Sequence, residues 1–91
     1  MQKEVQRIQE EMKQRVVEGS AGGEMVKVLV NGAGDVVSVK ILKDVVDPND
    51  LEMLEDLVLA ATNAALKKSR DMVQAEMAKV TGGLGGLPGL F

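Results

Sequence analysis

The side chains that could do chemistry in this chain are its acids and bases, because other reactive groups are missing. The 91 residues include no Cys and no His, which excludes a thiol nucleophile, an imidazole base and a zinc site of the usual kind. Carboxylates gathered in one stretch could bind a hard metal ion or transfer protons, but they equally suit the start of a helix, where the dipole favours negative charge. We favour the helix start, and expect no enzyme, metal, cofactor or small-molecule substrate. The acids concerned are Asp47, Asp50, Glu52, Glu55 and Asp56.

Two glycine-rich segments do not have the pattern of a phosphate-binding loop. Gly32 and Gly34 are followed neither by a Lys-Ser or Lys-Thr pair nor by a helical segment, both of which such a loop requires. Residues 82–86 follow a helical segment instead of opening one. We interpret the first as a hairpin turn and the second as part of a tail.

The basic residues are segregated along the chain, although its net charge is −3. Residues 47–66 contain five acids and no base, whereas residues 67–81 contain four bases and two acids. Bases near the end of a helix complement its dipole, but a dimer would double each basic patch and favour contact with phosphates. The bases that we consider for contact with DNA are Lys3, Arg7, Lys13, Arg15, Lys67, Lys68 and Arg70.

Two helices are expected to carry these bases. Residues 1–15 have apolar side chains at helical spacing and no Gly or Pro. A second helix should begin near Asp47, with Pro48 as its first residue, and continue to about residue 80. Such a helix would be roughly 50 Å long, whereas a compact domain of this size has a radius of gyration of about 12 Å. The helix must therefore bend or project beyond the domain.

Between the helices we expect three short strands, at residues 16–21, 25–30 and 35–41. Alternating β-branched residues indicate the second and third strands, and Asn31-Gly32 between them is a strong hairpin signal. The chain is thus predicted to be an α+β protein with a three-stranded antiparallel meander. A single domain at 1–81 should be followed by a flexible tail at 82–91, rich in Gly and Leu.

The second helix has more apolar surface than one small domain can cover. One face suits a sheet, and another, about a third of a turn away, repeats at the spacing of a helix–helix seam. Exposed apolar faces of this size usually mark interfaces, so we expect a homodimer and leave open which seam forms its contact. The packing positions expected on both helices are Val5, Ile8, Met12, Leu54, Val58, Leu66, Val73, Met77 and Val80.

Several segments of the chain, in this order and spacing, are similar to one family. They are Glu18-Gly19-Ser20-Ala21-Gly22-Gly23 before Val26-Lys27-Val28, Asn31-Gly32 through Val39-Lys40-Ile41, Asp47-Pro48 before Leu54-Glu55-Asp56-Leu57, Asn63-Ala64-Ala65, and Leu84-Gly85-Gly86-Leu87-Pro88-Gly89-Leu90-Phe91. Together they resemble the YbaB/EbfC family of bacterial nucleoid-associated proteins. The resemblance implies an intertwined α+β homodimer with projecting helices that binds duplex DNA in the cytoplasm, at the nucleoid, without enzyme activity.

Two functions remain to be compared. The first is a dimer that binds DNA phosphates with little sequence specificity, since a recognition-helix pattern is absent. The second is a protein-interaction module that docks an enzyme or regulator of DNA metabolism through its apolar seam and tail, as a pI of about 4.9 would favour. A membrane partner is not expected, because no apolar stretch approaches the ~20 residues of a membrane span.

Overall fold

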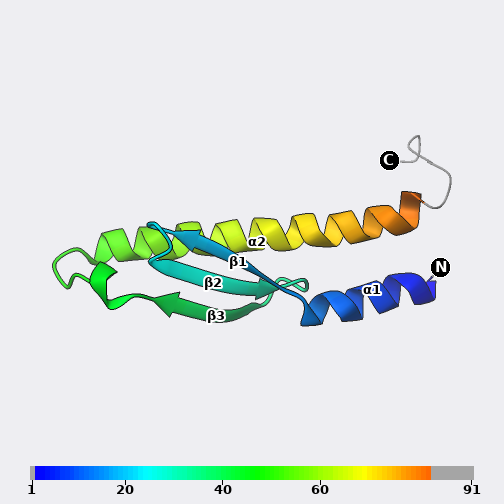
Figure 1. The fold of residues 1–91 in the computed structure, drawn as a ribbon, viewed down its shortest axis with the longest axis horizontal. Helices are drawn as coiled ribbons and strands as arrows, with labels where there is room; N and C mark the ends of the chain where they lie inside the picture. Colours follow the sequence, from blue (N-terminus) through cyan, green and yellow to red (C-terminus); the bar gives the residue numbers. More distant parts are fainter. Residues whose placement is uncertain (1, 83–91) are drawn as a thin grey trace.

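The computed structural model describes residues 2–82, and side chains from Lys3 to Lys79. A helix lies along one face of a three-stranded sheet, and a second helix extends from the end of the sheet (Figure 1). The strands are antiparallel in the order β1-β2-β3, which confirms the predicted α+β meander. The elements are α1 (Gln2–Gln14), β1 (Val16–Ala21), β2 (Val26–Asn31), β3 (Val36–Ile41), the 3-10 turn η1 (Lys43–Val45) and α2 (Leu51–Gly82).

The core forms where α2 crosses β1 and β2. Three valines of β2, at alternate positions 26, 28 and 30, are fully buried together with Ala61 and Ala65 of α2. These small residues let the helix come very close to the sheet: a Cβ atom added at Gly19 of β1 would overlap the Ala61 carbonyl oxygen and the Ala65 nitrogen. α2 therefore covers β1 and β2, and β3 stays largely uncovered.

The start of α2 differs from the prediction. The helix begins at Leu51, because Asp47 and Pro48 form a separate turn. The Asp47 side chain accepts a hydrogen bond of 2.9 Å from the Asn49 amide. Asp50 is the residue that caps the helix, accepting at 3.2 Å from the amide of Met53.

α2 projects beyond the sheet. Its 32 residues form one continuous helix (Figure 1), as expected of a stretch without Gly or Pro before its last residue. Of the two alternatives predicted, a bend or a projection, the structure has the projection. The predicted tail at 82–91 lies outside the described residues, apart from Gly82 at the end of α2, and so does the side chain of Val80.

The turn between β2 and β3 joins both helices to the sheet. The Gly32 amide donates hydrogen bonds to the carbonyl oxygens of Met12, at 2.8 Å, and Arg15, at 3.1 Å. The Ser69 hydroxyl of α2 donates to the Asn31 carbonyl oxygen at 2.7 Å. Ser69 is only 2% exposed, so this polar contact is shielded from water. We call these five residues the junction, because they fix α1 and α2 to one end of the sheet.

Candidate nucleic-acid interface

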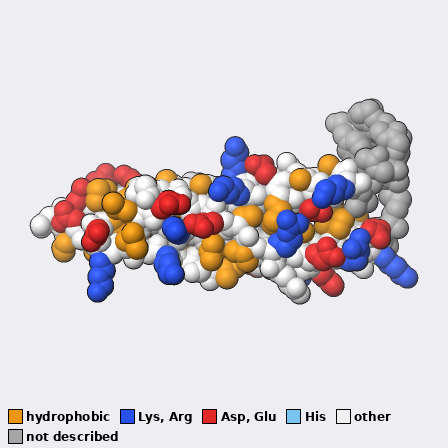
Figure 2. Space-filling view, in the orientation of Figure 1, with side chains coloured by type: hydrophobic (Ala, Val, Ile, Leu, Met, Phe, Trp, Pro, Cys, Tyr) orange, Lys and Arg blue, Asp and Glu red, His pale blue; other side chains and the backbone are white. Residues whose placement is uncertain are grey.

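Charge is distributed unevenly over the surface of the protein. Figure 2 shows acidic side chains gathered at the end of the molecule where α2 begins. Five of the chain's acids lie between residues 47 and 56, and Asp44 lies just before them. This end would repel the phosphates of a nucleic acid, so contact with DNA must come from elsewhere on the surface.

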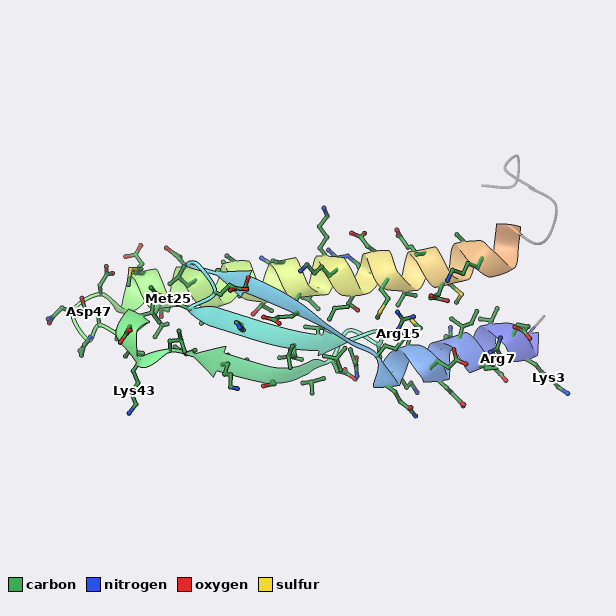
Figure 3. All side chains as sticks on the ribbon, in the orientation of Figure 1. Lys3, Arg7, Arg15, Met25, Lys43 and Asp47 are labelled. Carbon is green, nitrogen blue, oxygen red and sulfur yellow. The ribbon has the colours of Figure 1, made fainter. Side chains whose placement is uncertain are left out.

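All seven of the predicted DNA-contact bases are exposed, but two of them already have acidic partners. The Arg7 guanidinium binds two glutamates of its own helix, Glu4 at 2.7 Å and Glu11 at 3.1 Å. Arg15 points into the space between the helices (Figure 3) and binds Glu76 of α2 at 3.1 Å. These two arginines are therefore less available to phosphates than the sequence suggested.

Two bases bind Glu76 on the side of α2 that faces α1. Lys79 approaches its carboxylate at 3.2 Å, on the same oxygen that binds Arg15. Hydrogen bonds from Lys79 and then Arg15 lower the pKa of Glu76 below its ordinary value. Likewise, the hydrogen bond from Arg7 lowers the pKa of Glu4. The space between the helices thus has two positive charges that share one carboxylate.

The other five bases make no ion pair within residues 3–79, but they do not lie in one patch. Ile8 and Met12 are the buried side of α1, so helical geometry directs Lys3 and Lys13 away from α2, as Figure 3 shows for Lys3. On α2, Ala65 and Ser69 face the sheet, which places Lys67 and Arg70 about half a turn away on the outer side. Lys68 lies on a flank of the helix.

An apolar groove between β3 and α2 is a second candidate surface, one that the sequence analysis did not locate. Val39 and Ile41 share the sheet face of the core valines, yet they are 47% and 39% exposed because α2 lies over the other two strands. Leu59, at 60%, is more exposed still. The groove has a volume of about 480 Å³ and is lined by Ile41, Leu54, Glu55, Val58, Leu59 and Thr62.

The predicted packing positions differ in their burial. Ile8 and Met12 are 5% and 2% exposed, and six others are half-buried. The sequence pattern predicts that Leu66, Val73 and Val80 pack against Val5, Ile8 and Met12, within one chain or across a dimer, and this pairing stays a prediction. The half-buried positions are Val5, Leu54, Val58, Leu66, Val73 and Met77.

Neither a metal-binding cluster nor a membrane-spanning helix occurs in the part of the chain that the structure describes. No group of three or more acidic side chains there is placed to hold a metal ion. None of the helices between residues 2 and 82 combines the length and apolar character that crossing a bilayer requires.

The sequence matches one known protein family over most of its length. The model of the YbaB/EbfC DNA-binding family matches residues 1–84. The chain belongs to the YbaB/EbfC family. It is 55% identical to a nucleoid-associated protein of Acetivibrio thermocellus over 91 residues, covering all of this chain and 80% of the relative. A nucleoid-associated protein of Caldanaerobacter subterraneus is 53% identical, with 81% of the relative covered.

The fold of this YbaB/EbfC chain is also similar to the fold of a solved structure. The crystal structure of uncharacterized protein HP0035 from Helicobacter pylori has a TM-score of 0.70 and 27% sequence identity. The similarity covers 82% of this chain and 87% of that one. The family resemblance in the sequence and the predicted fold class are thereby confirmed.

Proposed function

We propose that this YbaB/EbfC chain is a non-enzymatic, nucleoid-associated protein that binds duplex DNA in the cytoplasm as a homodimer. The observation that carries the proposal is the match to a DNA-binding family over residues 1–84. The exposed bases of α1 and α2 supply a physical means, since Lys and Arg bind phosphates without reading sequence. The chain has a single aromatic residue, Phe91, and therefore little capacity to stack on bases.

The uncovered face of β3 supports the homodimer. β3 is an edge strand whose valines at 36, 37 and 39 are each about half exposed, and it borders the groove beside Leu59. An exposed apolar edge strand promotes pairing with another chain, and contiguous apolar patches mark interfaces. A second copy of the chain, presenting the same apolar surface, would cover both.

A protein-interaction module is the alternative function. The net charge of −3 and the acidic end of the molecule weaken attraction to DNA, and the groove could take an apolar segment of another protein. As a protein-interaction module, the chain would bind an enzyme or regulator of DNA metabolism through the apolar seam and tail.

Salt dependence separates the two functions. The experiment is a fluorescence anisotropy titration of a labelled duplex of roughly 30 bp and mixed sequence, at several salt concentrations. For the parent we expect an affinity that falls steeply with salt, because each neutralised phosphate releases counterions. Replacing Lys67, Lys68 and Arg70 by Ala should flatten the logarithmic slope by up to about three units per protomer.

A matched triple variant controls for net charge. Lys27, Lys40 and Lys43 lie on or beside the sheet, and their replacement by Ala removes the same charge but should leave the slope close to that of the parent. Sedimentation must show that both variants keep the oligomeric state of the parent. A parent without salt-sensitive binding at low salt would contradict DNA binding and favour the interaction module.

A further inference from the structure

The face of the sheet that points away from α2 carries a hollow lined by polar side chains. Side chains alternate between the two faces of a strand, so the burial of the β2 valines against α2 places Lys27 and Leu29 on the opposite face. Residues directly opposite on neighbouring strands share a face, and the register adds Glu18 of β1 with Ser38 and Lys40 of β3. These five residues line a hollow of about 230 Å³, which we call the polar hollow.

Two lysines lie directly opposite each other in the polar hollow. Lys27 of β2 pairs with Lys40 of β3, and side chains in such positions have Cβ atoms about 4.5–5.5 Å apart. Like charges directly opposite each other destabilise a sheet. Glu18 is the one acid that lines the hollow, and its carboxylate lies 3.8 Å from the Lys27 ammonium. Lys40 has no ion pair within residues 3–79, so the hollow has a net positive charge.

The groups around the two lysines indicate which anion the polar hollow suits. A phosphomonoester carries nearly two negative charges at pH 7 and three strong acceptor oxygens, which matches two ammonium groups and the hydroxyl of Ser38. Ser38 is half-buried on β3, and its side chain has no hydrogen bond within residues 3–79. Leu29, opposite Ser38, offers apolar contact to carbon atoms. On its other side, the Glu18 carboxylate can accept hydrogen bonds from hydroxyl groups.

Size and surroundings favour a small ligand. A volume of about 230 Å³ corresponds to roughly seven or eight water molecules at about 30 Å³ each, which is room for a phosphate group with a small hydroxylated substituent. Because α2 lies on the opposite face of the sheet (Figure 1), the polar hollow is open to solvent. The proposed homodimer would cover the apolar face of β3 and the groove, and would leave the polar hollow accessible.

We propose that the polar hollow binds a small phosphomonoester that carries hydroxyl groups, such as a sugar phosphate. The ammonium groups of Lys27 and Lys40 and the hydroxyl of Ser38 donate hydrogen bonds to the phosphate oxygens. Glu18 accepts a hydrogen bond from a hydroxyl group of the organic part. This site lies on the sheet, apart from the helices that carry the proposed DNA contacts, and its test uses no DNA.

The test is a titration of ¹⁵N-labelled protein followed by NMR at constant ionic strength, with glucose 6-phosphate, inorganic phosphate and glucose as separate ligands. Glucose 6-phosphate should shift the amide signals of residues 27–29 and 38–40 until they saturate, and glucose, which lacks the phosphate, should shift none of them. Lys27→Ala with Lys40→Ala should lower the affinity about tenfold, because bonds to a charged group are lost. The matched control, Lys67→Ala with Lys68→Ala, removes the same charge from α2 and should leave the affinity unchanged.

A further variant, Glu18→Ala, tests how the ligand is oriented. Loss of the carboxylate should raise the affinity for inorganic phosphate about threefold, because a repelling charge is removed. It should also cancel the advantage of glucose 6-phosphate over inorganic phosphate, because the sugar hydroxyl loses its acceptor. An advantage that persists in this variant would contradict the role of Glu18.

Several results would overturn the proposal. They are shifts that sodium chloride alone reproduces, an unchanged affinity in the Lys27 and Lys40 variant, and an equal loss in the Lys67 and Lys68 variant. Circular dichroism establishes that each variant is folded like the parent. Lys27→Gln with Lys40→Gln repeats the charge loss with longer side chains, so that a loss of binding is assigned to charge and not to a disturbed sheet.

Discussion

At the residue scale, very small side chains determine how closely α2 approaches the sheet. Gly19 of β1 lies under Ala61 and Ala65, both fully buried, and no space remains there for even one methyl group. The three valines of β2 supply the rest of the core. Because this core is thin and made of small residues, each of its contacts carries a large share of the stability.

Gly19→Ala should therefore lower the free energy of unfolding by about 3 kcal/mol or prevent folding, since the added methyl would meet backbone that cannot move aside. The measurement is urea denaturation followed by circular dichroism. Gly23→Ala is the control: Gly23 has open space around it and a φ of 65°, so only the left-handed backbone opposes the change, at about 1 kcal/mol. Equal losses in the two variants would contradict the close packing.

Glu76 should make stability depend on pH at the contact between the two helices. Its pKa is lowered in the folded state, so its stabilising effect is present above the unfolded pKa and is lost as the pH falls through the folded pKa. Glu76→Gln should therefore lower the melting temperature near neutral pH but not near about pH 2.

Thermal melts of parent and variant across this range provide the measurement. Glu10→Gln is the control, because Glu10 is exposed on α1 and outside the ion pairs of residues 3–79. A difference between parent and Glu76→Gln that persisted at low pH would assign the effect to packing and not to charge.

At the scale of elements, α2 has two different halves. Its first half lies on the sheet, and its second half runs past the sheet toward α1 (Figure 1). The junction lies where the two halves meet. The Ser69 hydroxyl of α2 donates to the Asn31 carbonyl oxygen, and the amide of Gly32, which follows Asn31, donates to the Met12 carbonyl oxygen of α1. The direction of both projecting helices is thus fixed by a few hydrogen bonds at the β2–β3 turn.

Ser69→Ala should cost about 1 kcal/mol, because the Asn31 carbonyl oxygen loses the hydroxyl of Ser69 and keeps the amide of Gly34, which donates at 3.0 Å. Hydrogen exchange should also show faster exchange at the start of β3 and at Gly32. Ser20→Ala, at an exposed position of β1, should change stability by less than about 0.5 kcal/mol. An equal effect of the two serine substitutions would show that the junction contributes nothing specific.

The helices and strands could be predicted from sequence patterns, because local chemistry determines them. Alternating valines at 26, 28 and 30 indicated a strand, and the absence of Gly and Pro indicated a long helix. The predicted start of α2 was wrong by three residues, since Asp47 and Asp50 are equally good capping residues. Only the observed hydrogen bonds, with Asp47 in a turn and Asp50 on the helix, distinguish them.

The candidate site was less predictable than the fold. The sequence analysis chose the bases by charge alone, and charge does not show that Arg7 and Arg15 have acidic partners. The pairing of Arg15 with Glu76 joins residues 61 positions apart, which no local pattern reveals. The exposed face of β3 depends on which strands α2 covers, and that is a property of the tertiary structure.

At the scale of the whole molecule, the chain is elongated, and its apolar residues are only partly covered by other elements. Its extents are 56 × 25 × 16 Å and its radius of gyration is 17.0 Å, against about 12 Å for a compact domain of this length. A molecule of this shape has a large surface for its volume, and much of it here is apolar, along β3 and the groove.

Leu59→Lys should therefore weaken the proposed homodimer, because it places a charge in the groove that a second copy would cover. Sedimentation velocity at several concentrations should show the parent at about twice 9.7 kDa, and the variant dissociating at concentrations where the parent does not. Val16→Lys, at a 45% exposed position of β1, is the control and should remain associated. A parent that sediments as a folded monomer would contradict the dimer.

The covering of the sheet by α2 has a consequence during synthesis. β3 emerges from the ribosome some 20 residues ahead of Ala61 and Ala65 of α2, which corresponds to a delay of about 1–5 s of translation. During that interval the valines of β2 and β3 lack the helix that buries them, and the nascent sheet offers two unprotected edges. The period of greatest exposure to aggregation thus lies between the emergence of β3 and that of the first half of α2, and slowing translation during that period should lower the yield of soluble protein.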